Sequence, residues 1–207
     1  MAYTGSHPMP TIRLSANAVT CSIPRSTVPT PPVRTAVTGW TRQASKRNRD
    51  FLQSVQYSGL TGRGYALTLT VRDCPASPEE WHTLRRAFFK RMERLGMLRA
   101  HWVIEMQRRK VPHLHVAIYF PDKPCPGPGH VISHWLEVAG GPYGALFHSQ
   151  RCDSIHSPLG WSKYLAKHAA RSVHHYQRDR SNMPPTWSTS GRLWGHLGDW
   201  PTLPDVI

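Results

Sequence analysis

The fold is decided by one stretch of sequence, Pro112-His113-Leu114-His115-Val116-Ala117-Ile118. Alternate side chains of a β-strand share a face, so we expect His113 and His115 to point to one side while Leu114 points into the core. Two imidazoles on one strand face are well placed to chelate a metal ion. A His-x-His pair alone is more often just two half-exposed histidines, so the prediction of a metal site needs a further ligand.

A carboxylate lies at the spacing that would supply this ligand. Glu105 belongs to a second apolar run, His101 to Met106, and the following segment, Gln107 to Lys110, is polar and turn-like. If the two runs pair as an antiparallel hairpin centred near Arg109, Glu105 lies opposite His113 on the same face of the sheet. The sequence therefore predicts that two imidazoles and one carboxylate converge on one point.

Two further motifs extend this pattern. Gly64 to Val71, which contains Leu-Thr-Leu-Thr, is typical of a buried strand that ends in hydroxyls, and Tyr164-Leu165-Ala166-Lys167 lies in a later expected helix. In this order the motifs resemble those of the HUH endonucleases (His, hydrophobic residue, His). Within that superfamily the chain is most similar to the rolling-circle replication initiators, or Rep proteins, of small phages and plasmids. The resemblance covers about residues 60 to 200.

The resemblance implies a role for each matching residue. It implies that Glu105, His113 and His115 bind Mg²⁺ or Mn²⁺, although a mixed imidazole and carboxylate site is equally compatible with zinc by ligand type. A bound metal would polarise and orient a DNA phosphate, and the Tyr164 phenol would attack phosphorus. A free phenol has a pKa of about 10, so it needs nearby positive charge, which the metal and Lys167 would supply.

The reaction implied by the resemblance is site-specific nicking of one DNA strand, followed later by rejoining. It leaves a 5′-phosphotyrosine and a free 3′ hydroxyl, which primes a polymerase. The covalent link preserves the phosphoester, so a later attack by a 3′ hydroxyl rejoins the strand without ATP. The sequence contains no Gly-x-x-x-x-Gly-Lys-Ser/Thr phosphate loop, so an initiator of this kind must borrow a host helicase.

The charge of the chain indicates a polyanionic partner. The 207 residues carry a formal net charge of +14, and nucleic acid is the expected partner. Single-stranded or origin DNA is expected at the site because the attacked phosphate must be exposed. Basic residues are most often merely solvated, but those beside a nicking site are candidates for contacting phosphates. We expect this DNA-binding role for Arg108, Arg109, Lys110, Lys163 and Arg171.

Other classes of protein are disfavoured by composition. No apolar run is long enough to cross a bilayer, and no signal-peptide core is present near the start of the sequence. The four cysteines are scattered and form no Cys-x-x-Cys pair, so we expect free thiols in a reducing compartment rather than zinc binding or disulfides. The cytoplasm of a bacterial host is the expected location, and a homodimer is one option for assembly.

The chain is expected to consist of an arm and one domain. Residues 1–45 are rich in Pro, Ser, Thr and Arg and predict a basic, mostly disordered arm. Residues 46–207 predict the endonuclease domain. The order strand, helix, strands, helix, strand predicts an α+β fold, and the resemblance implies a central antiparallel sheet of about five strands with helices packed on it. The segment around Trp194 could form a last strand that closes the sheet.

Local signals place the helices. A serine followed by a proline begins one helix at Ser77 and another at Ser157. A short helix is expected from His130 to Ala139, and a strand from Ala145 to Arg151. The helix after Ser157 is expected to continue to about Arg171. Spacing along it predicts that Trp161, Leu165 and Ala169 face the sheet, while Tyr164, Lys167, His168 and Arg171 lie on a neighbouring face that is presented rather than buried.

Several alternatives remain at this point. Some relatives carry two active tyrosines one helical turn apart, whereas here His168 and Gly160 flank Tyr164 at that spacing. His168 is expected to face solvent, and Tyr176 is expected to lie too far along the helix to replace Tyr164. Relaxases usually show a third histidine and an N-terminal tyrosine, which disfavours that class. A single-tyrosine HUH transposase and a non-catalytic DNA-binding protein on the same fold remain as alternatives to the initiator.

Overall fold

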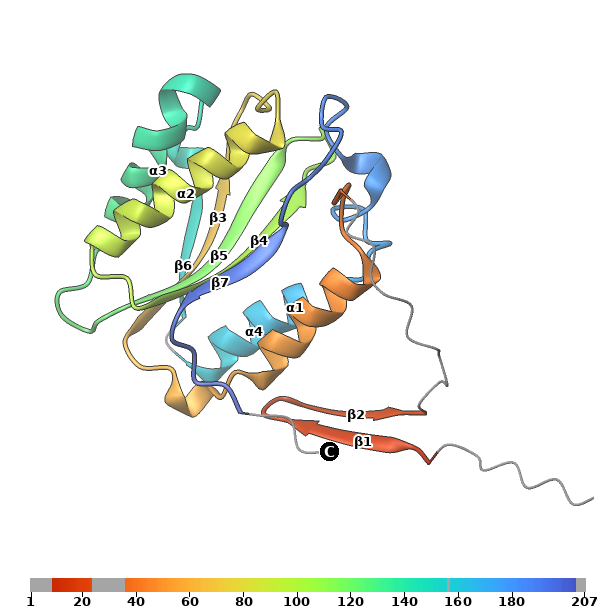
Figure 1. Ribbon diagram of the computed structural model, residues 1–207. Helices are drawn as coiled ribbons and strands as arrows, with labels where there is room; N and C mark the ends of the chain where they lie inside the picture. Colours follow the sequence, from red (N-terminus) through yellow and green to blue (C-terminus); the bar gives the residue numbers. More distant parts are fainter. Residues whose placement is uncertain (1–8, 24–35, 156, 204–207) are drawn as a thin grey trace, which may run out of the picture.

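The computed structural model describes residues 9–23, 36–155 and 157–203. At its centre lies a five-stranded antiparallel sheet with the strand order β6-β3-β5-β4-β7 (Figure 1). The strands are β3 (Arg63–Thr70), β4 (Arg99–Met106), β5 (Pro112–Phe120), β6 (Arg151–Ile155) and β7 (Trp194–Gly198). The α+β fold with a sheet of five strands is therefore confirmed, as is the last strand around Trp194.

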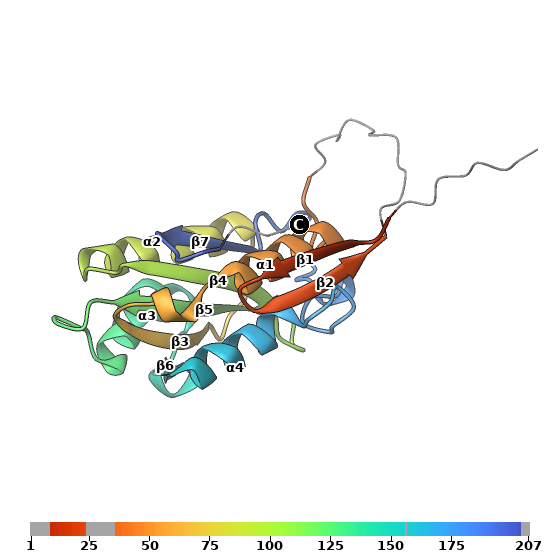
Figure 2. The ribbon, with the colours of Figure 1, turned by 90° about the horizontal axis from the view of Figure 1, so that it is seen from below.

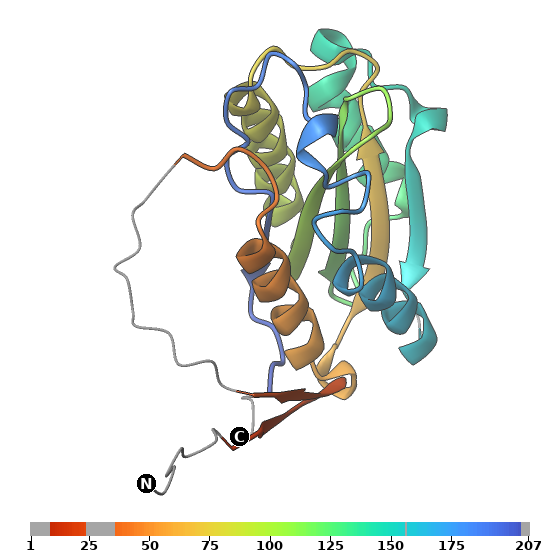
Figure 3. The same cartoon turned by 90° about the vertical axis from the view of Figure 1, so that its right-hand side faces the viewer.

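Two pairs of helices cover the two faces of this sheet (Figures 1 and 3). One face carries α2 (Pro78–Arg94) and α3 (Pro128–Tyr143), and the other carries α1 (Arg42–Ser54) and α4 (Pro158–Ala169). Leu114 of the central strand belongs to the cluster that includes α2 and α3, as do Val116 and Ile118. The alternation of β5 therefore turns His113 and His115 toward α1 and α4.

Large aromatic side chains fill the space between the sheet and α2 and α3. Trp81 and Trp135 are fully buried and meet edge to face, with ring centroids 5.7 Å apart. The Trp135 indole also donates a hydrogen bond to the carbonyl of Thr70 at 3.0 Å, which fixes α3 to the end of β3. This dense core holds the central strands rigidly, so the opposite face of the sheet can position a site.

The helix starts agree with the sequence signals. Ser77 Oγ accepts a hydrogen bond from the Glu80 amide at 3.2 Å, and Ser157 Oγ accepts one from the Gly160 amide at 3.3 Å. In both helices a proline occupies the first turn, where its missing N–H costs nothing. At the other end of α2, Gly96 has a φ of 83°, the left-handed conformation that terminates helices.

The predicted central hairpin is confirmed with its register. Glu105 of β4 pairs with His113 of β5, and Val103 pairs with His115. The turn that joins the strands is closed by a hydrogen bond from the Lys110 amide to the Gln107 carbonyl at 2.9 Å. Glu105 and both histidines consequently point from the same face of the sheet, at one end of its two central strands.

The segment between α3 and α4 differs from the prediction. We expected a strand over Ala145 to Arg151, but Phe147–Ser149 forms a 3₁₀ turn and the strand β6 is Arg151–Ile155. Helix α3 also continues beyond the predicted Ala139 to Tyr143. The error has a physical reason, since apolar Leu146 and Phe147 are exposed, whereas β6 is a polar edge strand without the alternation that marks a half-buried one.

The N-terminal region is more ordered than predicted where it is described. Strands β1 (Thr11–Ser15) and β2 (Ala18–Ser22) form a hairpin along α1 (Figure 2). The Asn17 side chain between them donates hydrogen bonds to the carbonyls of Gln53 and Val55. The expectation of a disordered arm over residues 1–45 is therefore wrong for 9–23 and for the start of α1. Residues 1–8 and 24–35, which include Val28-Pro29-Thr30-Pro31-Pro32, lie outside the described residues.

Two compositional expectations can be compared with the structure. All four cysteines lie in the described part of the chain, and all are free thiols, as predicted. Within the described ranges, no helix has the length and apolar character needed to cross a membrane.

Candidate functional site

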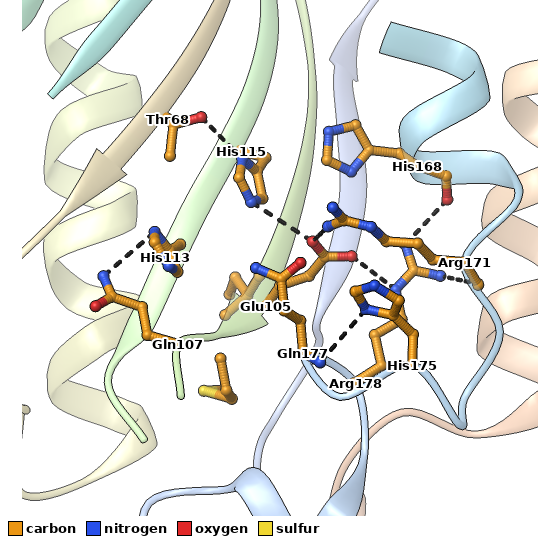
Figure 4. A network of polar contacts seen from close by, with 12 residues as sticks. Thr68, Glu105, Gln107, His113, His115, His168, Arg171, His175, Gln177 and Arg178 are labelled. Carbon is orange, nitrogen blue, oxygen red and sulfur yellow. Dashed lines mark hydrogen bonds and ion pairs between the residues drawn. The ribbon is translucent and has the colours of Figure 1, made fainter. Parts of the chain in front are cut away.

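Glu105 is the central charge of the site and is completely buried. Arg178 donates from Nε to its Oε1 at 2.8 Å, and Arg171 donates from Nη1 to its Oε2 (Figure 4). A carboxylate in a low-dielectric interior is tolerated only when it is paired and hydrogen-bonded in this way. Arg171, which we predicted to contact DNA, therefore pairs with the predicted metal ligand in the structure.

Arg178 holds the segment after α4 against the rest of the molecule. Its side chain is fully buried, and its guanidinium lies 4.1 Å from the ring centroid of Trp40. It also donates to the carbonyls of His168 and Arg171. Sequence reasoning missed this residue because an arginine in an irregular segment gives no periodic signal, and only the tertiary structure brings it to Glu105.

The two histidines of β5 lie side by side. Their rings stack with centroids 5.6 Å apart. Burial lowers the pKa of His113 to about 4, with the positive charges of Arg109 and Lys167 adding to the effect. Burial, followed by the charge of Lys167, also lowers the pKa of His115 well below its ordinary value. Both imidazoles are therefore neutral near pH 7, which is the form that binds a metal.

His115 is oriented by a hydroxyl that the Leu-Thr-Leu-Thr motif supplies. Thr68 lies directly opposite His115 in the β3–β5 ladder, and its Oγ1 is 3.0 Å from Nδ1 of the imidazole. If Nδ1 carries the proton and donates it to Thr68, the lone pair of Nε2 is free. Nε2 is buried without a hydrogen-bond partner and lies 3.5 Å from Glu105 Oε2 (Figure 4). An unsatisfied buried nitrogen of this kind calls for a ligand.

These residues fit a metal ion in part. The unpartnered nitrogen of His115, the neighbouring neutral His113 and the adjacent Glu105 are the right donor types for a divalent cation. Within the described residues, however, no group of three imidazole, carboxylate or thiolate side chains is arranged to hold a metal. The physical reason is that both oxygens of Glu105 are engaged by arginine. Binding through Glu105 therefore requires Arg171 to leave Oε2.

Tyr164 differs from the prediction in its surroundings. We expected it to be presented, but its side chain is only 5% exposed. It lies in a buried chain of hydrogen bonds: the Tyr164 hydroxyl is 2.9 Å from His101 Nδ1, and His101 Nε2 is 2.8 Å from Asn48 Oδ1. Because an amide oxygen only accepts, His101 donates from Nε2 and receives the phenol proton at Nδ1. Burial lowers the pKa of His101 to about 3 and raises that of Tyr164 well above 10.

The buried stripe of α4 explains this placement. Trp161, Tyr164 and His168 are the residues of α4 that are buried, whereas Leu165 and Ala169 are only partly buried. The stripe is rotated from the apolar one because polar groups on the sheet and on α1 offer Tyr164 and His168 partners. Hydrophobic periodicity does not detect such partners, so the sequence pattern favoured the wrong face.

His168 also corrects a prediction. We expected it to face solvent, but it is 1% exposed and its ring centroid lies 4.9 Å from that of His115. Burial lowers its pKa well below the ordinary value, and the neighbouring His115 adds to the effect. His168 Nδ1 is buried without a hydrogen-bond partner, as is His115 Nε2. Sequence analysis found this residue through its spacing from Tyr164 but assigned it the wrong environment.

A pocket of about 520 Å³ opens beside His115, between α4 and the strands β3 and β6. Its lining includes Lys163 and Lys167, and burial lowers the pKa of Lys167, with Arg171 adding to the effect. Arg151 lies at the same pocket and pairs with Asp153 at 2.6 Å. The structure thus brings the predicted Lys163 and Lys167 together with the histidine of the site, in a cavity whose charge suits a phosphate.

The tip of the β4–β5 hairpin carries three cations with different surroundings. Arg109 donates to the backbone carbonyls of Val71 and Arg72, so it ties the tip to the end of β3. The Arg108 guanidinium lies 5.2 Å from the ring centroid of Tyr176, and Lys110 is exposed. Arg109 therefore has a structural role in addition to the DNA contact that we predicted for it.

The chain turns back immediately after α4. The helix ends at Ala169 rather than near Arg171, and the following segment returns across the site. The amide of Met106, next to Glu105, donates to the carbonyl of Gln177 at 2.8 Å. Tyr176 consequently does not lie further along a helix, as we had assumed, but beside the end of β4.

The fold and this site define an α+β protein whose central strand carries paired histidines opposite a buried carboxylate. The family model for the replication-associated protein ORF2 and its phage counterparts matches residues 64–171, just over half of the chain. The chain therefore belongs to this family of replication-associated proteins. The matched segment begins in β3 and ends at Arg171, so it contains Glu105 and both histidines.

Three relatives support this assignment. The chain is 50% identical over 171 residues to the putative replication protein PDa0002 of Xylella fastidiosa (strain Temecula1), which covers 82% of this chain and 64% of the relative. It is 46% identical over 172 residues to the replication-associated protein of Pseudomonas phage Pf3, covering 82% and 62%. It is 48% identical over 174 residues to the putative replication protein XF_b0001 of Xylella fastidiosa (strain 9a5c), covering 81% and 59%.

The chain thus spans about three fifths of the length of these relatives. No solved structure matches it. The resemblance to the replication proteins of small phages and plasmids is confirmed at the level of the family.

Proposed function

We propose that the protein is a rolling-circle replication initiator, which nicks one DNA strand at an origin through metal-assisted attack of a tyrosine on a phosphate. The attack would join the 5′ phosphate to the tyrosine and release a 3′ hydroxyl that primes a polymerase. A later attack by a 3′ hydroxyl on the phosphotyrosine would rejoin the strand. One observation carries the proposal: the buried, unpartnered Nε2 of His115 lies beside Glu105 within the segment that the family model matches.

Each part of the site has a task in this reaction. Glu105, His113 and His115 would hold Mg²⁺ or Mn²⁺, and such an ion supplies Lewis acidity that polarises and orients a phosphate. Thr68 fixes the ring of His115 so that Nε2 faces the carboxylate. Lys167, which lines the adjacent pocket, adds positive charge where a phosphate would bind.

The nucleophile that the sequence predicts, Tyr164, meets an obstacle in this arrangement. Its hydroxyl donates to His101 beneath α4, and its pKa is raised by burial. A buried phenol that is already a hydrogen-bond donor cannot reach a phosphate unless α4 moves. Its role as nucleophile stays a prediction, and the accessible alternative is considered in the next subsection.

Several basic residues are proposed to guide the DNA. Lys163 lines the pocket beside His115, while Arg108 and Lys110 are exposed at the hairpin tip. Phosphate contacts of this kind position a strand without reading its sequence. Arg171 would exchange Glu105 for a DNA phosphate when a metal takes the carboxylate, since a guanidinium binds either anion.

The proposed partners follow from the reaction. They are single-stranded or origin DNA, a host helicase and a host polymerase, with a second copy of the chain as a homodimer partner, in the cytoplasm of a bacterial host. The names of the relatives concern replication, which favours an initiator over a transposase on the same fold. A non-catalytic DNA-binding protein is the alternative that the experiment below addresses.

A cleavage assay tests this function. The full chain would be incubated with a pool of single-stranded oligonucleotides of random sequence, with Mn²⁺ or with EDTA, beside His115→Ala. We expect Mn²⁺-dependent cleavage by the wild type and none by His115→Ala, because the variant lacks the unpartnered nitrogen. The matched control is His148→Ala, since His148 is exposed in the 3₁₀ turn before β6 and contacts none of the proposed ligands.

The outcomes separate the alternatives. Cleavage by the wild type and by His148→Ala, but not by His115→Ala, supports a metal-assisted nuclease. DNA that is bound but never cleaved by the wild type would leave only the non-catalytic protein. Cleavage that persists in EDTA, or in His115→Ala, would reject the proposed metal site.

A further inference from the structure

One tyrosine stands out by its exposure. Six of the seven tyrosines lie in the described residues, and among these six only Tyr176 is exposed, at 47% of its side chain. Tyr164 is 5% exposed, and Tyr65 and Tyr119 are also buried. An incoming DNA strand would therefore meet the phenol of Tyr176 without any rearrangement of the core.

The backbone places Tyr176 beside the candidate metal ligands. Met106, the neighbour of Glu105, donates its amide proton to the carbonyl of Gln177, the neighbour of Tyr176, at 2.8 Å. The same segment is fastened by Arg178, which donates to Glu105 Oε1 at 2.8 Å. Tyr176 is thus two positions from a residue that contacts the carboxylate, and its place is set by buried interactions.

The hydroxyl of Tyr176 has no competing partner. Among the described residues it makes no hydrogen bond, whereas the Tyr164 hydroxyl donates to His101. A free hydroxyl can approach phosphorus without first losing a buried hydrogen bond, and such a loss is costly in the protein interior. This difference favours Tyr176 over Tyr164 as an attacking group.

Positive charge surrounds the ring of Tyr176. The Arg108 guanidinium lies 5.2 Å from the ring centroid, and Lys110 follows in the same hairpin turn. Cations at this position attract a phosphate and stabilise the negative charge that develops on a phenol oxygen during attack. The hairpin that carries His113 therefore also carries the cations that face Tyr176.

We propose that Tyr176 is the nucleophile that becomes linked to the DNA, an inference that rests on the nicking function proposed above. In this step the phenol oxygen of Tyr176 forms a bond to phosphorus while the bond between phosphorus and the 3′ oxygen breaks. The phenol proton passes to water, and the departing 3′ oxygen takes a proton from water. One phosphoester replaces another, so the step needs neither an oxidant nor an energy source.

Peptide mapping of the covalent adduct tests the assignment directly. The full wild-type chain would be incubated with Mn²⁺ and 3′-labelled single-stranded oligonucleotides of random sequence, and the denaturant-resistant adduct would be digested with nuclease and trypsin. Trypsin cleaves after Lys and Arg, so the two candidates fall in different peptides, Tyr164–Lys167 and Ser172–Arg178. Mass spectrometry then shows which peptide carries the nucleotide.

A pair of variants supplies a second measurement. Tyr176→Phe removes only a hydroxyl that has no partner, so we expect its thermal midpoint to match that of the wild type while its adduct falls to the level without metal. Tyr57→Phe is the matched control, because Tyr57 is a half-buried tyrosine in the 3₁₀ turn before β3. It should form adduct as the wild type does.

The outcomes distinguish this inference from the function on which it rests. A nucleotide on Ser172–Arg178, with loss of adduct in Tyr176→Phe, supports Tyr176. A nucleotide on Tyr164–Lys167, or on any other peptide, overturns the inference and leaves the nicking function intact. If the wild type cleaves DNA without forming any adduct, attack by tyrosine is rejected altogether, and both proposals fail in their covalent step.

Discussion

Glu105 and Arg178 form the most consequential pair of residues in the molecule. Both side chains are fully buried, and Arg178 also contacts Trp40 and the carbonyl of His168. A buried pair adds little compared with well-packed apolar residues, but the loss of one partner leaves a charge uncompensated. The pair therefore specifies where the segment after α4 lies, and with it the places of Arg171 and Tyr176.

We expect Arg178→Met to lower the free energy of unfolding by about 3 kcal/mol, because Glu105 loses its ligand on Oε1 and several carbonyls lose their donor. Urea unfolding followed by tryptophan fluorescence measures this change. Arg94→Met is the control, since Arg94 is exposed on α2 and should shift stability by less than about 0.5 kcal/mol. Equal stability of the two variants would show that the buried pair does not hold the segment.

At the scale of the elements, α4 shows why sequence reasoning found the right helix and the wrong face. The Ser157 cap and the following proline are local signals, and the helix begins where they place it. Its orientation depends on His101 and Asn48, which come from β4 and α1 and provide a buried partner for Tyr164. No periodicity within α4 carries that information, because the partners are remote in sequence.

The interface between α4 and the sheet should also be sensitive to acid. The pKa of His101 is lowered to about 3 and those of His115 and His168 are lowered well below 6.5, all mainly by burial. Below about pH 6.5 the unfolded chain binds protons that the folded chain excludes, so stability falls as the pH falls, by up to about 1.4 kcal/mol per pH unit for each histidine.

Urea unfolding in EDTA at about pH 7 and about pH 5 measures this dependence. We expect a marked loss of stability at the lower pH, with a smaller loss in His168→Gln, which no longer excludes a proton there. Most carboxylates stay ionised in this window, so the histidines dominate the change. Stability that is the same at both pH values would mean that these histidines are not buried as the structure has them.

The hairpin of β4 and β5 was predictable in full, for the opposite reason. Its register follows from two apolar runs, a short polar turn and the strict two-residue alternation of strands, all of which are local in sequence. Alternation does not exclude a contact from elsewhere, however. The arginines that occupy Glu105 come from beyond α4, so the sequence predicted which side chains share a face but not the state in which the carboxylate is held.

On the scale of the whole molecule, distant segments converge on one end of the sheet. Residues from β3, β4 and β5 supply the candidate ligands and their hydroxyl support, while α1, α4 and the segment up to Arg178 close around them (Figures 1 and 4). The β1–β2 hairpin lies outside this arrangement, against α1. Composition marked the region before residue 45 as an arm, because two short exposed strands carry too few apolar residues to be recognised.

The central claim is that His113, His115 and Glu105 form a divalent metal site, and titration with Mn²⁺ followed by electron paramagnetic resonance tests it most directly. The signal of free Mn²⁺ disappears on binding, so the measurement needs neither DNA nor activity. We predict that the wild type and His148→Ala each bind one Mn²⁺ per chain, and that His115→Ala does not, because it lacks the unpartnered nitrogen beside Glu105. A wild type that leaves the Mn²⁺ signal unchanged, or a His115→Ala variant that binds equally well, would contradict the account.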